Sequence, residues 1–285
     1  MKPFISLMRR AAGARFAVAA AALLACAAAA DAPDFRLAGP LMQGALVQGT
    51  APARTIALTL DGKPVPLAPD GHFLLGFDRD QAGSALLVAE LEDGGTLRRP
   101  LAIAPRIWPI EHVDIARRPG AATEDYLRLR ERELARIDAA RALRPPSLGW
   151  RQRFIWPARG RISGVFGSQR IYRGGEAGSY HSGVDIAAGA GAVVVAPADG
   201  VVVLAGPPAF SLEGDLVIVA HGMGLNSAFL HLASPLVREG EAVRQGQPIG
   251  IVGSTGRATG PHLHWSMRWN EARIDPQPLA GAMGP

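Results

Sequence analysis

Apolar and polar residues alternate in short runs between residues 35 and about 105. This period of two predicts β-strands with one buried face. Asp-Gly pairs at 61–62, 70–71 and 93–94 separate the runs and favour the positive backbone angles of tight hairpins. We therefore predict a small antiparallel β-domain over residues 31–108, whose one histidine, His72, has a structural role. The alternating apolar positions are Ile56, Leu58, Leu60, Phe73, Leu75, Leu86, Val88, Leu97 and Leu101.

Residues 123–143 are rich in charged side chains and contain neither glycine nor proline. Their apolar residues recur at helical spacing and predict one amphipathic helix within a linker at 109–150. Thr123 is a suitable N-cap, and Pro145-Pro146 ends the helix. The charged face is either a solvated surface or an inhibitory arm over an active site further along the chain. The apolar residues of the predicted stripe are Tyr126, Leu127, Leu134 and Ile137.

After Trp150 the chain changes to short runs of valine, isoleucine and leucine that are separated by glycine and proline. Examples are the runs at 193–195, 201–204, 216–219 and 249–252. Many short strands joined by glycine turns predict an all-β domain over residues 151–285. The sequence shows no phosphate-binding glycine loop and no alternation of strands with long helices, which disfavours nucleotide-dependent α/β folds.

The first thirty residues have the organisation of a secretion signal. Four basic residues precede an Ala-rich apolar run from Phe16 to Ala30. A run of about 15 residues is short for a bilayer core, which needs about 20, so we favour a cleaved signal peptide (1–30) over a retained anchor. Cleavage would reduce the formal net charge from +5 by these four charges to +1, too little to indicate a nucleic-acid partner. The basic residues are Lys2, Arg9, Arg10 and Arg15.

Cys26 is the only cysteine, and it lies inside this signal. An internal disulfide is therefore excluded, and catalysis by a thiol of the mature chain is excluded with it. The sequence from Leu23 to Cys26 resembles a lipobox, in which the cysteine carries the lipid, although Leu24 replaces the usual small residue. Ordinary cleavage near residues 28–30 is the alternative, so we expect export to the periplasm or cell envelope, with or without a lipid anchor.

Five of the seven histidines lie between residues 181 and 264. His181 and Asp185 are four residues apart in a segment that reads as extended, so they share one face of a strand. His262 and His264 are two residues apart and also share a face. Catalytic zinc sites use three protein ligands and leave a fourth position for water, and His181, Asp185 and His264 fit this number.

Zinc in such a site would generate a nucleophilic water near neutral pH and would polarise an amide carbonyl, which points to amide hydrolysis. The chain has no HExxH sequence, so proton transfer falls to His231 and His262. We assign these two histidines general acid/base and oxyanion-stabilising roles, without dividing the roles between them. We expect a structural or supporting role for the fifth histidine of the group, His221.

The order of these motifs strongly resembles the lysostaphin-like, or LytM-like, zinc metallopeptidases that act on peptidoglycan. The resemblance covers residues 154–278 and begins with the segment 156–167 and the HxxxD at 181–185. It continues through Val193–Gly200, the Phe-Leu-His-Leu at 229–232, Val243–Gly250 and the Gly-Ser-Thr-Gly at 253–256. It ends with Pro-His-Leu-His at 261–264. Phe229 stands where the family often has tyrosine.

This resemblance implies an antiparallel β-sandwich-like peptidase domain with a groove over one zinc ion. It implies His181, Asp185 and His264 as zinc ligands and His231 and His262 as catalytic histidines. Some members have lost metal ligands and activate separate wall amidases, but this chain keeps all five residues. We therefore expect a monomeric, mainly all-β zinc endopeptidase whose substrate is peptidoglycan, with loops 169–179 and 206–213 along the groove. The alternative is a non-catalytic activator.

Overall fold

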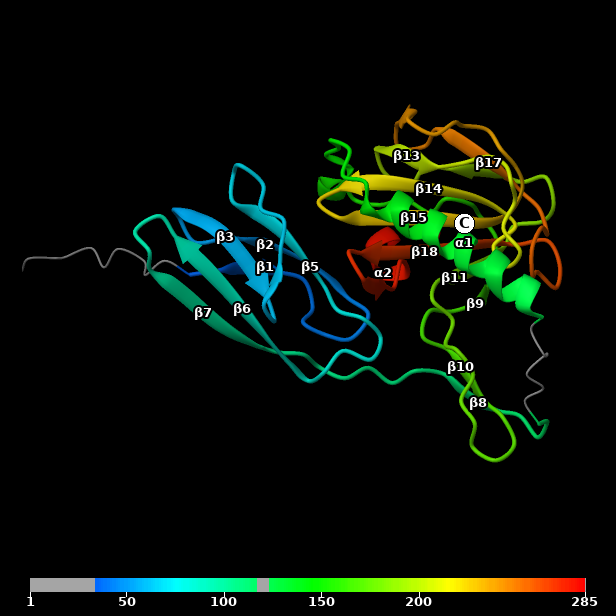
Figure 1. The fold of residues 1–285 in the computed structure, drawn as a ribbon, viewed down its shortest axis with the longest axis horizontal. Helices are drawn as coiled ribbons and strands as arrows, with labels where there is room; N and C mark the ends of the chain where they lie inside the picture. Colours follow the sequence, from blue (N-terminus) through cyan, green and yellow to red (C-terminus); the bar gives the residue numbers. More distant parts are fainter. Residues whose placement is uncertain (1–33, 117–122, 285) are drawn as a thin grey trace, which may run out of the picture. The chain divides into compact units, whose positions relative to one another are not determined.

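The N-terminal part of the chain forms two small antiparallel sheets, drawn in blue and cyan in Figure 1. This computed structural model describes residues 34–116 and 123–284. Asp61 and Gly62 both have positive φ in the hairpin between two of the strands, as the Asp-Gly pattern predicts. The first sheet has the order β1 (Arg36–Ala38), β2 (Leu46–Thr50), β5 (His72–Gly76). The second has the order β4 (Lys63–Pro64), β3 (Thr55–Leu60), β6 (Ser84–Leu91), β7 (Thr96–Ala102).

Helix α1 (Glu124–Ala142) follows, and Thr123 caps it by accepting a hydrogen bond from the Tyr126 amide at 3.2 Å. The predicted helix and its cap are therefore confirmed. The predicted buried stripe is wrong in part, because Leu127 and Leu134 are 56% and 43% exposed. The helix instead buries Ile137, Ala140 and the carboxylate of Glu133, which accepts hydrogen bonds from the amide and hydroxyl of Ser211.

Most of the chain after α1 forms a ten-stranded sheet. The protein is thus mainly β, which confirms the predicted fold class. Its strands pair in antiparallel fashion, and β15 contacts β14, β17 and β18. The main path runs β16 (Ala242–Val243), β13 (Gly200–Leu204), β14 (Asp215–Gly222), β15 (Leu225–Pro235), β18 (Leu263–Trp269), β11 (Val184–Ala187), β9 (Arg161–Gly164). Off this path lie β12 (Val193–Val195), β17 (Pro248–Val252) and β19 (Ala272–Ile274). Two short helices, η1 (Gly149–Arg151) and α2 (Gln277–Ala280), complete the domain.

The two faces of this sheet bury different cores. On β14, Val217 and Val219 point into the main core, whereas Leu216 and Ile218 point to a second core under α1. Ile137 and Ala140 of α1 belong to this second core, so the helix covers part of one sheet face (Figure 1).

A short parallel pair joins the linker to the loop that precedes β11. Strand β8 (Ile110–His112) pairs with β10 (Gln169–Ile171), and exposed ion pairs of 2.7 Å join Glu111 to Arg170 and Asp114 to Arg173. The segment between β9 and β11 is therefore held partly by residues about 60 positions earlier in the chain. Within the described ranges, no helix is long and apolar enough to cross a membrane. The predicted signal peptide and Cys26 lie outside the described residues.

Candidate metal and catalytic site

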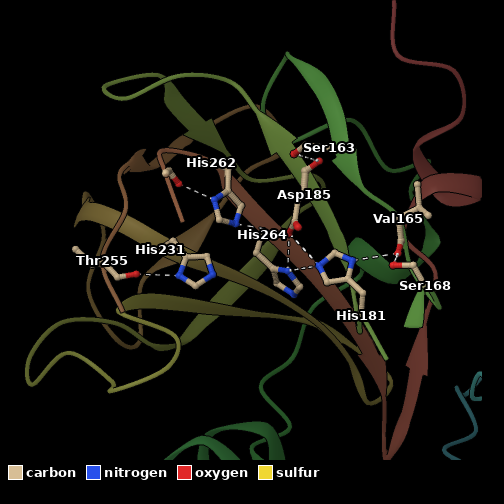
Figure 2. A network of polar contacts seen from close by, with 10 residues as sticks. Ser163, Val165, Ser168, His181, Asp185, His231, Thr255, His262 and His264 are labelled. Carbon is tan, nitrogen blue, oxygen red and sulfur yellow. Dashed lines mark hydrogen bonds and ion pairs between the residues drawn. The ribbon is translucent and has the colours of Figure 1, made fainter. Parts of the chain in front are cut away.

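His181, Asp185 and His264 converge on one point of the large sheet (Figure 2). Strand register explains part of this convergence, because Asp185 on β11 lies directly opposite His264 on β18. His181 reaches the same point from the loop before β11. Its Nε2 lies 3.0 Å from Asp185 Oδ1 and 3.0 Å from His264 Nδ1, and His264 Nδ1 lies 2.9 Å from Asp185 Oδ1.

The spacing and chemistry of these three atoms fit a small divalent metal ion. Ligands of a tetrahedral zinc lie about 2.0–2.2 Å from the ion, which places neighbouring donors a little over 3 Å apart. The Nδ1–H of His181 donates to the Val165 carbonyl at 3.0 Å, so the lone pair of Nε2 is directed at the cluster. Gly164 leaves room for the cluster, because a Cβ there would lie 2.4 Å from Asp185 Oδ2.

The charges of the cluster favour an ionised carboxylate. Burial by itself raises the pKa of Asp185, but the contacts with His181 and His264 outweigh burial and bring this pKa well below its usual range. Burial lowers the pKa of His264 and keeps its imidazole neutral. At His181 burial also lowers the pKa, but the adjacent carboxylate outweighs burial and the net shift is upward. A carboxylate beside neutral imidazole is the protonation state that binds a metal ion.

His231 reaches the same face because β15 contains a bulge. Between Phe229 and Leu232, β15 has one residue more than the facing segment of β14, and His231 adopts a left-handed φ of 64°. A bulge of this kind redirects a side chain. The Nδ1–H of His231 donates to the Thr255 carbonyl at 2.9 Å, which leaves Nε2 free, and burial lowers the pKa of this ring.

His262 lies beside His231, with 4.9 Å between their ring centroids (Figure 2). Its Nδ1–H donates to the Gly260 carbonyl at 2.8 Å, and its Nε2 lies 3.8 Å from Asp185 Oδ1. All five residues that the sequence predicts for the site are thus brought together. The carbonyls of residues 165, 255 and 260 that orient these rings were not predicted, although the last two lie in or beside the motifs at 253–256 and 261–264.

His221 lies away from this cluster and is completely buried. Its Nδ1 donates to the Asp199 carbonyl at 2.8 Å, and its Nε2 lies 2.9 Å from Ser227 Oγ, to which Trp265 Nε1 also donates at 3.3 Å. Phe229, in the position where the family often has tyrosine, is fully buried in the main core. A phenol there would point away from the histidines, so its replacement by phenylalanine removes no group from the site.

Part of this chain is similar to known peptidases. Residues 179–276 match the family model of peptidase family M23. A solved structure of a peptidase M23 from Pseudomonas aeruginosa is similar with a TM-score of 0.65 and 29% identity, over 86% of this chain and 96% of that chain. The peptidoglycan DD-endopeptidase ShyA of Vibrio cholerae is 37% identical over 116 residues, which are 41% of this chain and 26% of ShyA.

The murein hydrolase activator NlpD of Escherichia coli is 36% identical over 131 residues, which are 46% of this chain and 31% of NlpD. The chain thus spans less than a third of the length of these two curated relatives. The family match covers all five clustered residues, from His181 to His264. Residues 179–276 therefore contain a peptidase M23 domain, which confirms the family that the motifs indicate.

Proposed function

We propose that this chain is a zinc-dependent endopeptidase that hydrolyses a peptide bond in the stem or cross-link of bacterial peptidoglycan. The observation that carries the proposal is the convergence of His181, Asp185 and His264 beside the free Nε2 atoms of His231 and His262. Similarity to a peptidoglycan endopeptidase and to a murein hydrolase activator supports the substrate class.

His181 Nε2, Asp185 Oδ1 and His264 Nδ1 would hold one zinc ion. When bound, zinc supplies a water that ionises near neutral pH and polarises the carbonyl of the scissile bond. Asp185 also balances part of the positive charge, and the contact between His181 and the Val165 carbonyl holds that ligand in its tautomer.

His231 and His262 would move the protons of the reaction. Each ring donates its Nδ1–H to a backbone carbonyl, so Nε2 is the atom that would face the substrate. One Nε2 accepts a proton as the amide carbon is attacked and returns it to the leaving amine, and the other donates to the developing oxyanion when its ring is protonated.

An activator without catalysis is the alternative, and the similarity to NlpD is the observation that favours it. A protein that only binds an amidase needs no metal ligands and no paired histidines. This chain keeps three converging donor atoms and two histidines with fixed tautomers, which favours hydrolysis.

The proposal extends to where the protein works. Residues 1–30 would direct export to the periplasm or cell envelope, with Cys26 as the lipid attachment point if the protein is anchored. We also propose the division into a β-domain at 31–108, a linker at 109–150 and a peptidase domain at 151–285, acting as a monomer.

Digestion of purified, cross-linked peptidoglycan tests the proposed function. The mature protein, with zinc and after metal removal, is incubated with the wall, and released muropeptides are identified by mass spectrometry. We expect zinc-dependent loss of cross-linked dimers, and the masses of the products identify the bond. A fully zinc-loaded protein that releases nothing, but stimulates a purified amidase, would establish the activator instead.

A further inference from the structure

A bidentate ion pair joins helix α1 to the loop at residues 206–213. Arg130 donates from Nη1 and Nη2 to the two carboxylate oxygens of Glu213, each at 2.6 Å. Both side chains are largely buried, at 16% and 17% exposure, and the guanidinium also donates to Glu133 at 2.9 Å. A buried bidentate pair of this kind fixes both distance and orientation, unlike an exposed ion pair.

Glu133 completes the attachment of the helix to the same loop. Its carboxylate is nearly buried and accepts from the Ser211 amide at 2.6 Å and from the Ser211 hydroxyl at 2.7 Å. One arginine thus balances two carboxylates, Glu133 and Glu213. Without Arg130, two like charges would be left in a partly desolvated place with no cation between them.

The backbone of Glu213 is hydrogen-bonded to the backbone of His231. The His231 amide donates to the Glu213 carbonyl at 2.8 Å at the bulge, where the backbone of His231 has a left-handed φ. A residue other than glycine in that conformation is strained and persists only where its surroundings hold it. The next residue, Gly214, packs against Thr255, whose carbonyl accepts the ring proton of His231.

We propose that Arg130 is a positioning residue for His231: through its paired bonds to Glu213 it holds the loop that fixes the bulge. This inference rests on the proposed function, in which His231 Nε2 handles a proton. Among the described residues, Arg130 donates side-chain hydrogen bonds only to Glu133 and Glu213, so it acts through Glu213 and does not take part in the chemistry. Under this inference α1 supports the catalytic site, in contrast to the inhibitory arm considered from the sequence.

Substitution of both partners tests the inference in the full mature protein. We expect Arg130→Gln and Glu213→Gln each to lower kcat by about 10- to 100-fold, because small displacements of a catalytic group have effects of this size. KM and zinc content should stay near the wild-type values. The double variant should lose no more than either single variant, since both act through one contact, and Arg130→Lys should recover part of the rate.

Arg136 provides a matched control on the same helix. It donates to the carbonyls of Pro208 and Gly206 at the other end of the same loop and pairs with Glu239, without contacting Glu213. Arg136→Gln should therefore weaken helix docking while kcat remains near wild type. An equal loss of kcat in Arg136→Gln, or a wild-type kcat in Arg130→Gln, would overturn the positioning role.

Hydrogen exchange provides a measurement independent of turnover. We expect amide exchange in a peptide containing His231 to accelerate in Arg130→Gln and to stay slow in Arg136→Gln, because the His231 amide loses its held acceptor only in the first. Unchanged exchange in Arg130→Gln would contradict the inference. A wild type that is inactive on peptidoglycan would refute the proposed function, while this exchange measurement would still decide the role of Arg130.

Discussion

The free nitrogen of each histidine decides what the site can do at the residue scale. His181, His231 and His262 each donate Nδ1–H to a backbone carbonyl and present Nε2, whereas His264 presents Nδ1 to Asp185. Three of these tautomers therefore depend on main-chain positions, which any residue type can occupy. The sequence spacing identified the imidazoles, but it contained no signal for the carbonyls that orient them.

The two histidines outside the ligand set should affect turnover without affecting metal binding. We expect His231→Ala and His262→Ala each to lower kcat by about 10²- to 10⁴-fold, the usual contribution of a positioned acid or base. Zinc content, measured by atomic absorption, should stay near one per chain. His72→Ala, a histidine beside Asp70 in the N-terminal sheets, serves as the control. Wild-type turnover in either site variant would remove that residue from the mechanism.

Gly164 should be sensitive to a single added methyl group. A Cβ at this position would lie 2.4 Å from Asp185 Oδ2 and 3.1 Å from His181 Cε1, so we expect Gly164→Ala to displace two of the proposed ligands. We expect zinc affinity, measured by competition with a chelator, to fall by at least about 10-fold. Gly83→Ala is the control, because its nearest contact would be a carbonyl at 3.9 Å. Equal zinc affinity in both variants would show that the ligand loop adjusts freely.

His221 should make stability depend on pH. Burial lowers its pKa to about 4 from the usual 6.5, so the folded protein keeps this ring neutral. Above about pH 6.5 the His221 ring is neutral in both the folded and the unfolded protein, so its full contribution to the free energy of unfolding is present. As pH falls from 6.5 towards 4, only the unfolded chain takes up the proton, and about 3 kcal/mol of stability is lost. Below about 4 the loss is complete.

Urea unfolding of the zinc-loaded protein between pH 7.5 and 4.5 measures this effect. His221→Gln keeps a hydrogen-bonding side chain but has no titrating ring, so its unfolding free energy should vary less with pH than that of the wild type. The other ionisable groups are common to the two proteins and cancel in the difference. Identical pH dependence would mean that water reaches His221 in the folded state.

At the scale of single elements, local sequence signals predicted where α1 begins and ends, but they did not predict which face of the helix is buried. Thr123 and Pro145-Pro146 bracket the helix as predicted, because caps and prolines act on neighbouring residues. Glu133 is buried because Ser211 and Arg130 satisfy its carboxylate, and Ser211 lies 78 residues away along the chain. Helical periodicity predicts that an acidic residue is exposed to solvent, and it contains no information about a partner as distant in sequence as Ser211.

The packing of α1 should follow the observed face rather than the predicted one. Ile137 is 3% exposed in the core shared with β13, β14 and β15, so Ile137→Ala should lower the free energy of unfolding by about 2–5 kcal/mol. Leu134→Ala, on the same helix at 43% exposure, should change it by less than about 1 kcal/mol. Chemical denaturation of both variants measures the difference, and equal losses would contradict the orientation of the helix.

At the scale of the whole molecule, the β content of the chain could be predicted from the sequence, but the pairing and register of its strands could not. Turn residues and alternating positions predict a mainly β chain, and the motif order indicates which residues meet at the site. The parallel pairing of β8 with β10 and the bulge at His231 were not predicted. The pairing of β8 with β10 joins segments 59 residues apart, and the bulge is one extra residue within the hairpin of β14 and β15. A one-residue change of register alters neither composition nor local pattern.

Metal binding should stabilise the folded chain as a whole, because the three proposed ligands come from segments up to 83 residues apart and meet only after folding. At free zinc about 1,000 times the dissociation constant, the expected gain is about 4 kcal/mol, visible as a higher midpoint in thermal unfolding. Asp185→Asn, which removes the charged ligand between the two imidazoles, should lose most of this zinc-dependent shift. Because magnesium prefers oxygen ligands in an octahedral arrangement, it should not replace zinc in this assay. A midpoint that is the same with and without zinc would show that His181, Asp185 and His264 do not bind the metal, even though their donor atoms meet.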